Sequence, residues 1–597
     1  MQVNRTATGT ANHAKNMQAG YTYDTDNRIK KLAYNIPGVD NTFASYYYSS
    51  DKNSTDVAVG ALTKMSMFSK GWINYTYDAQ GRLFKRNIGD LLNESYAYLS
   101  KPGDANNSTT TWIEGKAIWA PDNTSLKYFS YEYNSLGYIE SEHESKSGTG
   151  LEYTYDNQGQ LLTAEKFVNS FLFETYAYTY DTYGNLRTAT DGTTSHTYTY
   201  GDSDWADLLT AYDGTALTYD AIGNPTSYYN GSSYTMTWRN GRELQNLTKG
   251  GKKTSYEYDV DGLRNLKTNA DGSYSVYYWL GNLLLAEERH TGNSTRVLVF
   301  SYDENNSPIG FQFKTNDGPW YYYLYAKNIQ GDIVALYRRD INADGTRSAT
   351  HIANYEYDPW GKILSIKNAA GQDISGNPDN SANVNPLRYR GYYYDNESGF
   401  YYLQSRYYDS SIGRFINADS YASTGQDFLG YNMFAYCNNN PTCLIDNNGT
   451  LCTHSIGVTD TGAHYIPHVR TSDETKNKPK RFAEPDASID VGFNVDGIYG
   501  TTSVSASHGD VHDDNTNLDY YFDIGKVEAS AGVGWNGINY SAGAYLTEGG
   551  VTCKIFGANV TFCGNIGIGS SVQSNSKGME FGVSCLIGFS ITISWDN

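Results

Sequence analysis

A short phrase that repeats along the first two thirds of this 597-residue chain constrains its fold more than any other feature. Each copy has aromatic residues at alternate positions, then aspartate, two variable residues and glycine or asparagine, then a second alternating run. Alternation suits a strand with one buried face and Asp-x-x-Gly suits a tight turn, so one copy predicts one β-hairpin. The clearest copies are YTYDTDNRI from Tyr21, YTYDAQGRL from Tyr75, YTYDNQGQL from Tyr153, YTYDTYGNL from Tyr178, LTYDAIGNP from Leu217, YEYDVDGLR from Tyr256 and YEYDPWGKI from Tyr355.

The spacing of the copies predicts a stacked array. The motif recurs at about 20 residues or simple multiples of that interval, and weaker copies such as YEYNSLGYI from Tyr131 and TMTWRNGREL from Thr235 fill the gaps. A hairpin this short cannot bury its own apolar face, so it must pair edge to edge with its neighbours. We therefore predict a mostly β fold in which residues from about 20 to 450 form one long antiparallel sheet that curls into a shell.

Tyrosine fills 57 of the 597 positions, and a shell explains this number. A tyrosine packs a large ring on a sheet while its hydroxyl reaches water or a polar partner. A rival interpretation is a stacking platform for sugars or single-stranded nucleic acid. The formal charge of −20 opposes the nucleic-acid version, because it repels phosphate chains.

The repeats resemble those of the RHS (rearrangement hot spot) and teneurin-like YD-shell proteins over roughly residues 20 to 450. The strongest part is NPLRYRGYYYDNESGFYYLQSRYYDSSIGRFINADS from Asn385, continued by GYNMFAYCNNNPTCLIDNNGT from Gly430, which is similar to the RHS core that closes the repeat region. The resemblance implies a repeat shell over residues 1–384, a closing core or plug over 385–450, a linker over 451–489 and a variable C-terminal β domain over 490–597.

The resemblance implies self-cleavage as an enzymatic activity of the core. In such proteins two aspartates inside the shell act like an aspartic protease and cut the chain just after the core. By motif position these are Asp419 in FINADS and Asp446 in NPTCLIDNNGT, with the cut after Thr450 and Arg414 in an orienting role. The chemistry requires two carboxylates that share one proton, so that one activates water while the other protonates the scissile amide.

The motif departs from the family pattern at three places. The usual Asp-Pro pairs read Asp419-Ser420 and Asp446-Asn447, and Thr450 stands where leucine is common. The alternative role for both aspartates is to cap turns through hydrogen bonds from their side chains to the backbone.

Cysteine and histidine usage predicts neither a disulfide scaffold nor a metal site. The six cysteines form no CxxC pair, and Cys437 and Cys443 suit either a disulfide bridge or small buried thiols. His464 and His468 have i,i+4 spacing, but Pro467 stands between them and no HExxH glutamate is present. We expect no cofactor and no metal.

From Asp490 onward apolar residues alternate strictly with Gly, Ser, Ala and Thr, as in MEFGVSCLIGFSITISW from Met579. This pattern predicts a second, small all-β domain with one bulky and one tiny face. A packed meander and a membrane-inserting β-hairpin toxin both suit it. A further alternative is enzymatic cargo, and the run SHGDVHDDNTN from Ser507 has metal-ligand residue types, but solvated loops share that composition.

The resemblance implies a secreted or surface-attached bacterial protein that encloses and delivers its own C-terminal domain as a toxic effector in competition between cells. A cognate immunity protein and a target-cell surface are the implied partners, and nucleic acid is not expected to bind. No signal peptide is recognisable, so we expect this chain to be part of a longer protein. The alternative function is an adhesive or wall-associated shell with a C-terminal binding module and no released toxin.

Overall fold

A computed structural model describes most of the chain as two compact units, Met1–Thr459 and Asp460–Asn597. The described residues are 2–5, 17–26, 28–36, 39–49, 61–67, 71–100, 109–342, 344–420, 428–450, 452–454, 484–494, 497–513, 518–534, 537–555, 558–575, 578–585 and 587–595. The predicted linker lies almost wholly outside them, and the finer predicted boundaries at 384, 450 and 489 stay predictions.

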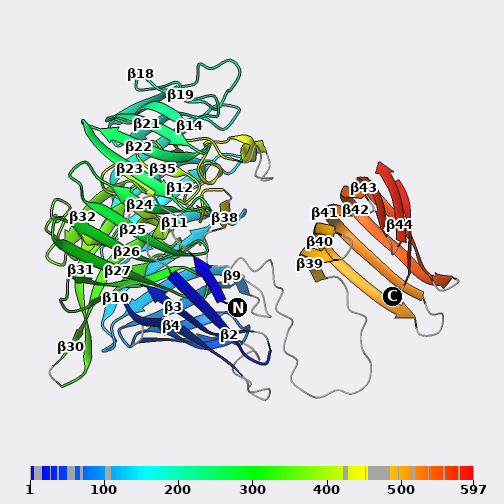
Figure 1. The fold of residues 1–597 in the computed structure, drawn as a ribbon, viewed down its shortest axis with the longest axis horizontal. Coiled ribbons are helices and arrows are strands. Elements are labelled where there is room, and N and C mark those ends of the chain that lie inside the picture. Colours follow the sequence, from blue (N-terminus) through cyan, green and yellow to red (C-terminus); the bar gives the residue numbers. More distant parts are fainter. Residues whose placement is uncertain are drawn as a thin grey trace. The chain divides into compact units, whose positions relative to one another are not determined.

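The first unit is built from antiparallel hairpins, as the repeats predict (Figure 1). Each strand of its first sheet pairs with the next along the chain, from β1 to β18. These strands are β1 (Gln2–Arg5), β2 (Met17–Tyr23), β3 (Ile29–Ile36), β4 (Val39–Tyr48), β5 (Leu62–Met67), β6 (Gly71–Tyr77), β7 (Leu83–Ile88), β8 (Leu92–Ser100), β9 (Thr109–Trp119), β10 (Ser125–Tyr133), β11 (Ile139–Glu144), β12 (Thr149–Tyr155), β13 (Leu161–Val168), β14 (Phe171–Tyr180), β15 (Leu186–Asp191), β16 (Thr194–Thr199), β17 (Ala211–Tyr212) and β18 (Thr215–Ala216).

A second sheet of 14 strands begins directly after Leu217, so the predicted continuous sheet is divided in two at this point. Its strands are β19 (Thr218–Tyr219), β20 (Pro225–Tyr229), β21 (Ser233–Arg239), β22 (Glu243–Lys249), β23 (Lys252–Tyr258), β24 (Arg264–Thr268), β25 (Tyr274–Leu280), β26 (Leu283–Thr291), β27 (Ser294–Tyr302), β28 (Pro308–Thr315), β29 (Tyr321–Lys327), β30 (Ile333–Ile341), β31 (Arg347–Tyr357) and β32 (Ile363–Asn368). The mostly β, antiparallel fold class is thereby confirmed.

The aspartate of each repeat caps its own turn. Asp78 Oδ1 accepts hydrogen bonds from the backbone N–H groups of Gln80 (3.0 Å) and Arg82 (2.9 Å), and its backbone closes the hairpin with Arg82. Gly81 adopts φ +79°, a conformation that L side chains rarely reach. The same capping pattern recurs at Asp156, Asp181, Asp220, Asp259 and Asp358. The predicted position of the hairpin turn is therefore correct.

In most copies a tyrosine near the end of the strand before the turn joins its hairpin to the preceding one. Its hydroxyl donates a hydrogen bond to a backbone carbonyl oxygen in a strand of the preceding hairpin, usually at the start of that strand, as in Tyr180 to Leu161 (2.7 Å) and Tyr98 to Leu83 (2.8 Å). In the weaker copies the indole N–H of Trp238 or Trp279 makes the same bond. Equivalent tyrosine bonds occur at Tyr48, Tyr77, Tyr133, Tyr155, Tyr200, Tyr302 and Tyr357. We refer to this series as the tyrosine ladder.

Buried polar side chains join the two sheets. Arg86 of β7 pairs with Asp303, in the turn after β27, at 2.7 Å, and both side chains are almost fully buried. Gln330, in the turn after β29, donates to Glu142 of β11 at 2.6 Å. Burial raises the pKa of Glu142 to about 7, with a smaller contribution from Asp332. The seam between the sheets is thus polar and holds a carboxyl group that titrates near neutrality.

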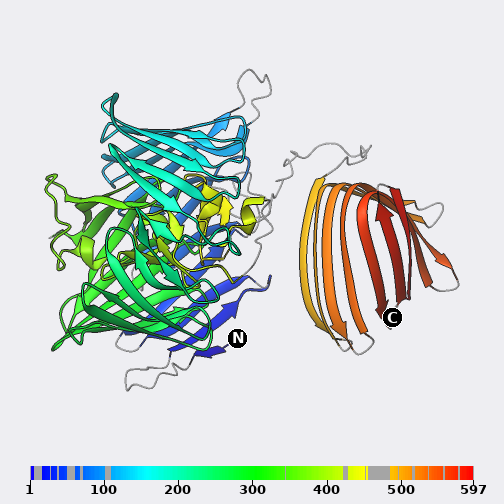
Figure 2. The ribbon, with the colours of Figure 1, turned by 90° about the horizontal axis from the view of Figure 1, so that it is seen from above.

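The described residues of 385–454 (385–420, 428–450 and 452–454), here called the closing segment, lie between the cyan strands of the first sheet and the green strands of the second (Figure 2). Asn439 donates to Gln160 of the first sheet at 2.8 Å. Asp395 accepts from Lys267 of the second sheet at 2.9 Å and pairs with the fully buried Arg264. Its elements, with the short helix before it, are α1 (Ser381–Val384), η2 (Tyr389–Gly391), β33 (Tyr393–Asp395), β34 (Phe400–Tyr402), β35 (Tyr407–Asp409), β36 (Arg414–Phe415), η3 (Phe428–Tyr431), η4 (Cys437–Asn439), β37 (Leu444–Asp446) and β38 (Cys452–His454).

The second unit is one antiparallel sheet of seven strands, in agreement with the predicted all-β C-terminal domain (Figure 2). Its strands are β39 (Glu484–Asn494), β40 (Gly497–Asp513), β41 (Leu518–Gly534), β42 (Gly537–Ile555), β43 (Ala558–Asn575), β44 (Gly578–Cys585) and β45 (Ile587–Trp595). Side chains in this unit lie outside the described part of the structure. The run SHGDVHDDNTN begins inside β40, so its residues 507–513 are strand rather than loop, and residues 514–517 lie outside the described part. Within the described residues, no helix has the length and apolar composition needed to cross a bilayer.

Removing one rung of the tyrosine ladder should lower stability. We expect Tyr180→Phe to reduce the free energy of unfolding by about 1 kcal/mol, because the Leu161 carbonyl loses its tyrosine donor. The measurement is the shift of the urea midpoint. Tyr183→Phe removes an exposed hydroxyl in the neighbouring turn and serves as the control. Equal midpoints for both variants would contradict a stabilising role of the ladder.

The seam should weaken as the pH rises. The pKa of Glu142 is raised in the folded state, so the stability that its proton supplies is complete below about pH 4.5 and is lost as the pH rises through about 7. Glu142→Gln should therefore gain stability over the natural protein at pH 8 and little at pH 4.5. Thermal unfolding at both pH values measures this, with Glu132→Gln, an exposed change on the adjacent strand, as control. A gain that does not depend on pH would contradict the titration.

Candidate self-cleavage site

The two aspartates singled out from the sequence meet at one guanidinium group. Arg406 Nη2 lies 2.8 Å from Asp419 Oδ2 and 3.4 Å from Asp446 Oδ2. Both carboxylates are almost completely buried, with 2% of Asp419 and none of Asp446 exposed. Because the two oxygens contact the same nitrogen, the carboxylates lie close to each other despite 26 intervening residues in the sequence.

Backbone hydrogen bonds position each aspartate. The N–H of Asp419 donates to the Met433 carbonyl at 2.9 Å, which ties the end of FINADS to the returning chain. The N–H of Asp446 donates to the Tyr392 hydroxyl at 2.9 Å, at the end of β37. Tyr392 in turn contacts Tyr436 through a hydroxyl–hydroxyl bond of 3.0 Å. A buried network of aromatic side chains therefore supports the acidic pair.

Asp446 also caps the turn in which the predicted cut lies. Its Oδ1 accepts from the backbone N–H groups of Asn448 (3.3 Å), Gly449 (2.7 Å) and Thr450 (3.1 Å). The capping role considered from the sequence is therefore present at Asp446. It does not exclude catalysis, because the other oxygen of the same carboxylate faces Arg406 and Asp419.

The backbone next to the predicted cut is bound by two side chains. The Gly449 carbonyl accepts from Ser405 Oγ at 2.7 Å and from Arg406 Nε. Arg406 Nη1 donates to the Met433 carbonyl at 3.1 Å, and its guanidinium carbon lies 3.6 Å from the centre of the Phe415 ring. One arginine thus holds both carboxylates and the turn that precedes the cut.

Arg414, the arginine expected to orient the aspartates, makes other contacts. Its guanidinium donates to the Tyr200 hydroxyl at 2.8 Å and to the Asp207 carbonyl at 2.9 Å. It anchors the closing segment to the first sheet. Arg406, which occupies the orienting position, lies in the quoted motif LQSRYY but was not selected from the sequence, because no local pattern distinguishes it from Arg414.

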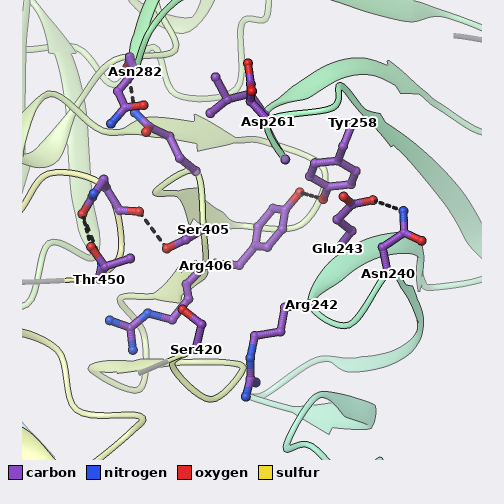
Figure 3. Close-up of a pocket in the computed structure, with 15 residues that line it drawn as sticks. Asn240, Arg242, Glu243, Tyr258, Asp261, Asn282, Ser405, Arg406, Ser420 and Thr450 are labelled. Atoms are coloured by element: carbon purple, nitrogen blue, oxygen red, sulfur yellow. Dashed lines mark hydrogen bonds between the residues drawn. The ribbon is translucent and has the colours of Figure 1, made fainter. Parts of the chain in front are cut away.

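A cavity of about 310 Å³ adjoins the acidic pair (Figure 3). Arg242 and Glu243 from the second sheet face Ser405, Arg406 and Thr450 of the closing segment across it. Ser420, next to Asp419, and Asn448 also line it. The cavity therefore gives water a place beside the turn that carries the predicted cut.

Burial raises the pKa of Asp446 above the usual aspartate range, against the opposing effect of Arg406 and of three backbone N–H groups. With both carboxylates ionised, the pair and Arg406 carry one net negative charge, the same as two carboxylates that share one proton. Arg406 thus replaces the shared proton in stabilising the close pair. Protonation of Asp446 then supplies one acid beside one base. Among the described residues, no group of three or more His, Cys, Asp or Glu is arranged to hold a metal ion.

Several known proteins are similar to this chain in sequence. The tRNA3(Ser)-specific nuclease WapA of Bacillus spizizenii is 30% identical over 276 residues, which cover 46% of this chain and 11% of that protein. The toxin protein Tse5 of Pseudomonas aeruginosa is 36% identical over 109 residues, 17% of this chain and 8% of that protein. No family model matches the chain. The chain spans about a tenth of the length of these relatives.

The crystal structure of TcdB2-TccC3-Cdc42 has a TM-score of 0.56 at 19% identity, over 73% of this chain and 22% of the matched chain. A Tc holotoxin pore structure from Photorhabdus luminescens matches equally well, with a TM-score of 0.56 at 19% identity over 74% and 22% of the two chains. These structures share the fold of antiparallel repeat hairpins. Together with the repeats and the closing segment, these similarities confirm the resemblance to the RHS/YD-repeat shell proteins.

Removing Arg406 should destabilise the closing segment. In Arg406→Gln two buried carboxylates lose their countercharge, and we expect a loss of about 3 kcal/mol at pH 8. The loss should be smaller at pH 5, where a carboxylate more readily takes up a proton. Thermal unfolding at the two pH values measures both effects. Arg242→Gln, which removes a cavity arginine that donates to the Ile222 carbonyl, is the control; an equal effect of both changes would contradict the special position of Arg406.

Proposed function

We propose that the chain is the shell and cargo portion of a secreted or surface-attached bacterial toxin. Residues 1–384 form the repeat wall, 385–450 the closing core, 451–489 a linker and 490–597 the effector domain that the protein delivers to another cell. The observation that carries this proposal is the buried pair of Asp419 and Asp446, the second of which lies four residues before Thr450. A site that cuts there separates shell from cargo.

The relatives support delivery of a variable cargo. The similar proteins include a tRNA nuclease, a double-stranded DNA deaminase toxin and a toxin protein, so related chains carry different activities. The alternating Gly, Ser and Ala of residues 490–597 leave few positions for converging catalytic groups. We therefore propose a binding or membrane-directed action for this effector rather than hydrolysis of nucleic acid.

We further propose that Asp419 and Asp446 cut the chain after Thr450. In this mechanism ionised Asp419 takes a proton from a water molecule in the adjoining cavity, and the water oxygen attacks the Thr450 carbonyl carbon. Protonated Asp446 then donates to the departing amide nitrogen. Arg406 is a positioning residue, because it holds both carboxylates and the Gly449 carbonyl.

An adhesive or wall-associated shell that releases nothing is the second candidate function. The observation that favours it is the capping of the 446–450 turn by Asp446, which a purely structural aspartate also provides. Growth arrest on intracellular expression of residues 451–597 would favour the toxin. Rescue by a co-expressed small protein encoded next to the gene would identify the proposed immunity partner.

Self-cleavage is tested by the intact mass of freshly purified protein. We expect two fragments that meet at Thr450–Leu451, and a single full-length chain in Asp419→Asn and in Asp446→Asn. Asp409→Asn is the matched control, because Asp409 is a buried carboxyl of the same segment that binds Tyr228 and Asn230 instead of Arg406. Cleavage that persists in Asp446→Asn removes Asp446 from the proposed mechanism.

Cleavage should slow as the pH rises. The proposed acid, Asp446, must be protonated, and its raised pKa extends the protonated range above that of an ordinary aspartate. Protein refolded from denaturant should therefore be cut several-fold faster at pH 5 than at pH 8, as followed by gel densitometry over time. A rate that rises with pH would assign the proton donor elsewhere.

A further inference from the structure

Two buried thiols lie on opposite sides of the predicted cut. Cys437 belongs to η4, before Thr450, and is completely buried. Cys452 opens β38, two residues after Thr450, and only 7% of it is exposed. In the β37–β38 pairing Cys452 lies opposite Asp446, so the chain beyond the cut returns into the core of the shell.

The two thiols are in contact with each other. The elements η4 and β38 pack together, both cysteines belong to one buried cluster, and a side-chain hydrogen bond joins Cys437 to Cys452. The thiol of Cys443 faces a different neighbourhood, where it contacts the Ile139 N–H at 3.3 Å and the Tyr155 hydroxyl at 3.7 Å. The bridge between Cys437 and Cys443 considered from the sequence is therefore not the arrangement that the fold favours.

We propose that Cys437 and Cys452 form a redox-controlled disulfide that retains the C-terminal segment on the shell after the chain has been cut. Retention of the C-terminal segment rests on the proposed cut, whereas formation of the disulfide does not. Oxidation joins the two sulfurs and releases two protons and two electrons. A disulfide-bearing oxidant, such as oxidised glutathione or a protein disulfide, accepts them by thiol–disulfide exchange.

The disulfide matters because few other interactions would hold the C-terminal segment after cleavage. After cleavage the segment is bound locally by three residue pairs, Leu444–His454, Ile445–Thr453 and Asp446–Cys452. Such short strand pairing can open by fraying. A disulfide makes the attachment covalent in the oxidising environment outside a cell, and a reducing cytosol breaks it. The arrangement therefore delays release of the cargo until the compartment changes.

Burial sets the rate of the exchange. The pKa of the Cys437 thiol is raised by burial and by the adjacent Cys452, so little reactive thiolate forms while the hairpin is closed. We infer that oxidation and reduction both proceed when β38 separates from β37. The bond should form during folding in an oxidising medium and resist brief exposure to a reductant.

The full chain should be refolded with a mixture of oxidised and reduced glutathione, and its remaining thiols then blocked. Chymotrypsin cuts after Tyr436, Leu444 and Leu451, which places Cys437 and Cys443 together on the peptide 437–444 and Cys452 on another peptide. Fragmentation of the linked pair in the mass spectrometer then shows which of Cys437 and Cys443 carries the blocking group. We expect a linked pair of Cys437 and Cys452 peptides and a blocked Cys443. A Cys437–Cys443 link, or three blocked thiols, would overturn the proposal. This peptide mapping detects the Cys437–Cys452 disulfide whether or not the chain is cut after Thr450.

A second readout tests retention where cleavage occurs. On a denaturing gel the shell and C-terminal fragments should run together without reductant and separately with it. Cys452→Ser and Cys437→Ser should each abolish the joint band and leave the cut intact, whereas Cys443→Ser should keep the joint band. Separate fragments without reductant in the natural protein would refute retention. An uncut chain that still gives the Cys437–Cys452 peptide pair would refute the cut alone.

Discussion

The hydrogen bond from a repeat tyrosine to the carbonyl of the preceding hairpin is the interaction on which the wall depends. Hairpins of about 20 residues have too little apolar surface to fold alone. The ladder gives each one a fixed register against its neighbour, because the hydroxyl of a residue such as Tyr180 reaches one carbonyl, that of Leu161. A phenylalanine could fill the same space but could not select this register, which explains why tyrosine rather than phenylalanine dominates the composition.

Features held by interactions between residues close in the sequence could be predicted, whereas features that depend on contacts between distant segments could not. The hairpins and their Asp-capped turns are local, since donor and acceptor lie within four residues, as at Asp78 and Arg82, and they could be predicted. The break between the sheets at Leu217 and the selection of Arg406 over Arg414 depend on contacts between distant segments. Motif position was enough to select Asp419 and Asp446, but no spacing indicates which arginine lies between them.

Charged side chains are buried inside the first unit, and each of these charges is stabilised there by an oppositely charged partner. Arg264 binds Asp395 among four tyrosine rings, and Arg86 binds Glu94 and Asp303 at the seam. An isolated buried charge is strongly destabilising, so each such pair forms only when both partners are in register. The closing segment is thereby restricted to one position against the two sheets, and this also fixes the position of Asp419 and Asp446.

In the mechanism that we propose, the turn between β37 and β38 has three roles: it is capped by Asp446, it carries the cut, and its strands retain the product. Asp446 stabilises the turn through its Oδ1 while its Oδ2 contacts Arg406, which also binds Asp419, so the backbone up to Thr450 is held beside the groups proposed to cut after it. Holding a scissile bond this firmly also holds the product. A site built in this way needs a separate means of release, and the disulfide that we propose between Cys437 and Cys452 would respond to the chemistry of the compartment rather than to the cut itself.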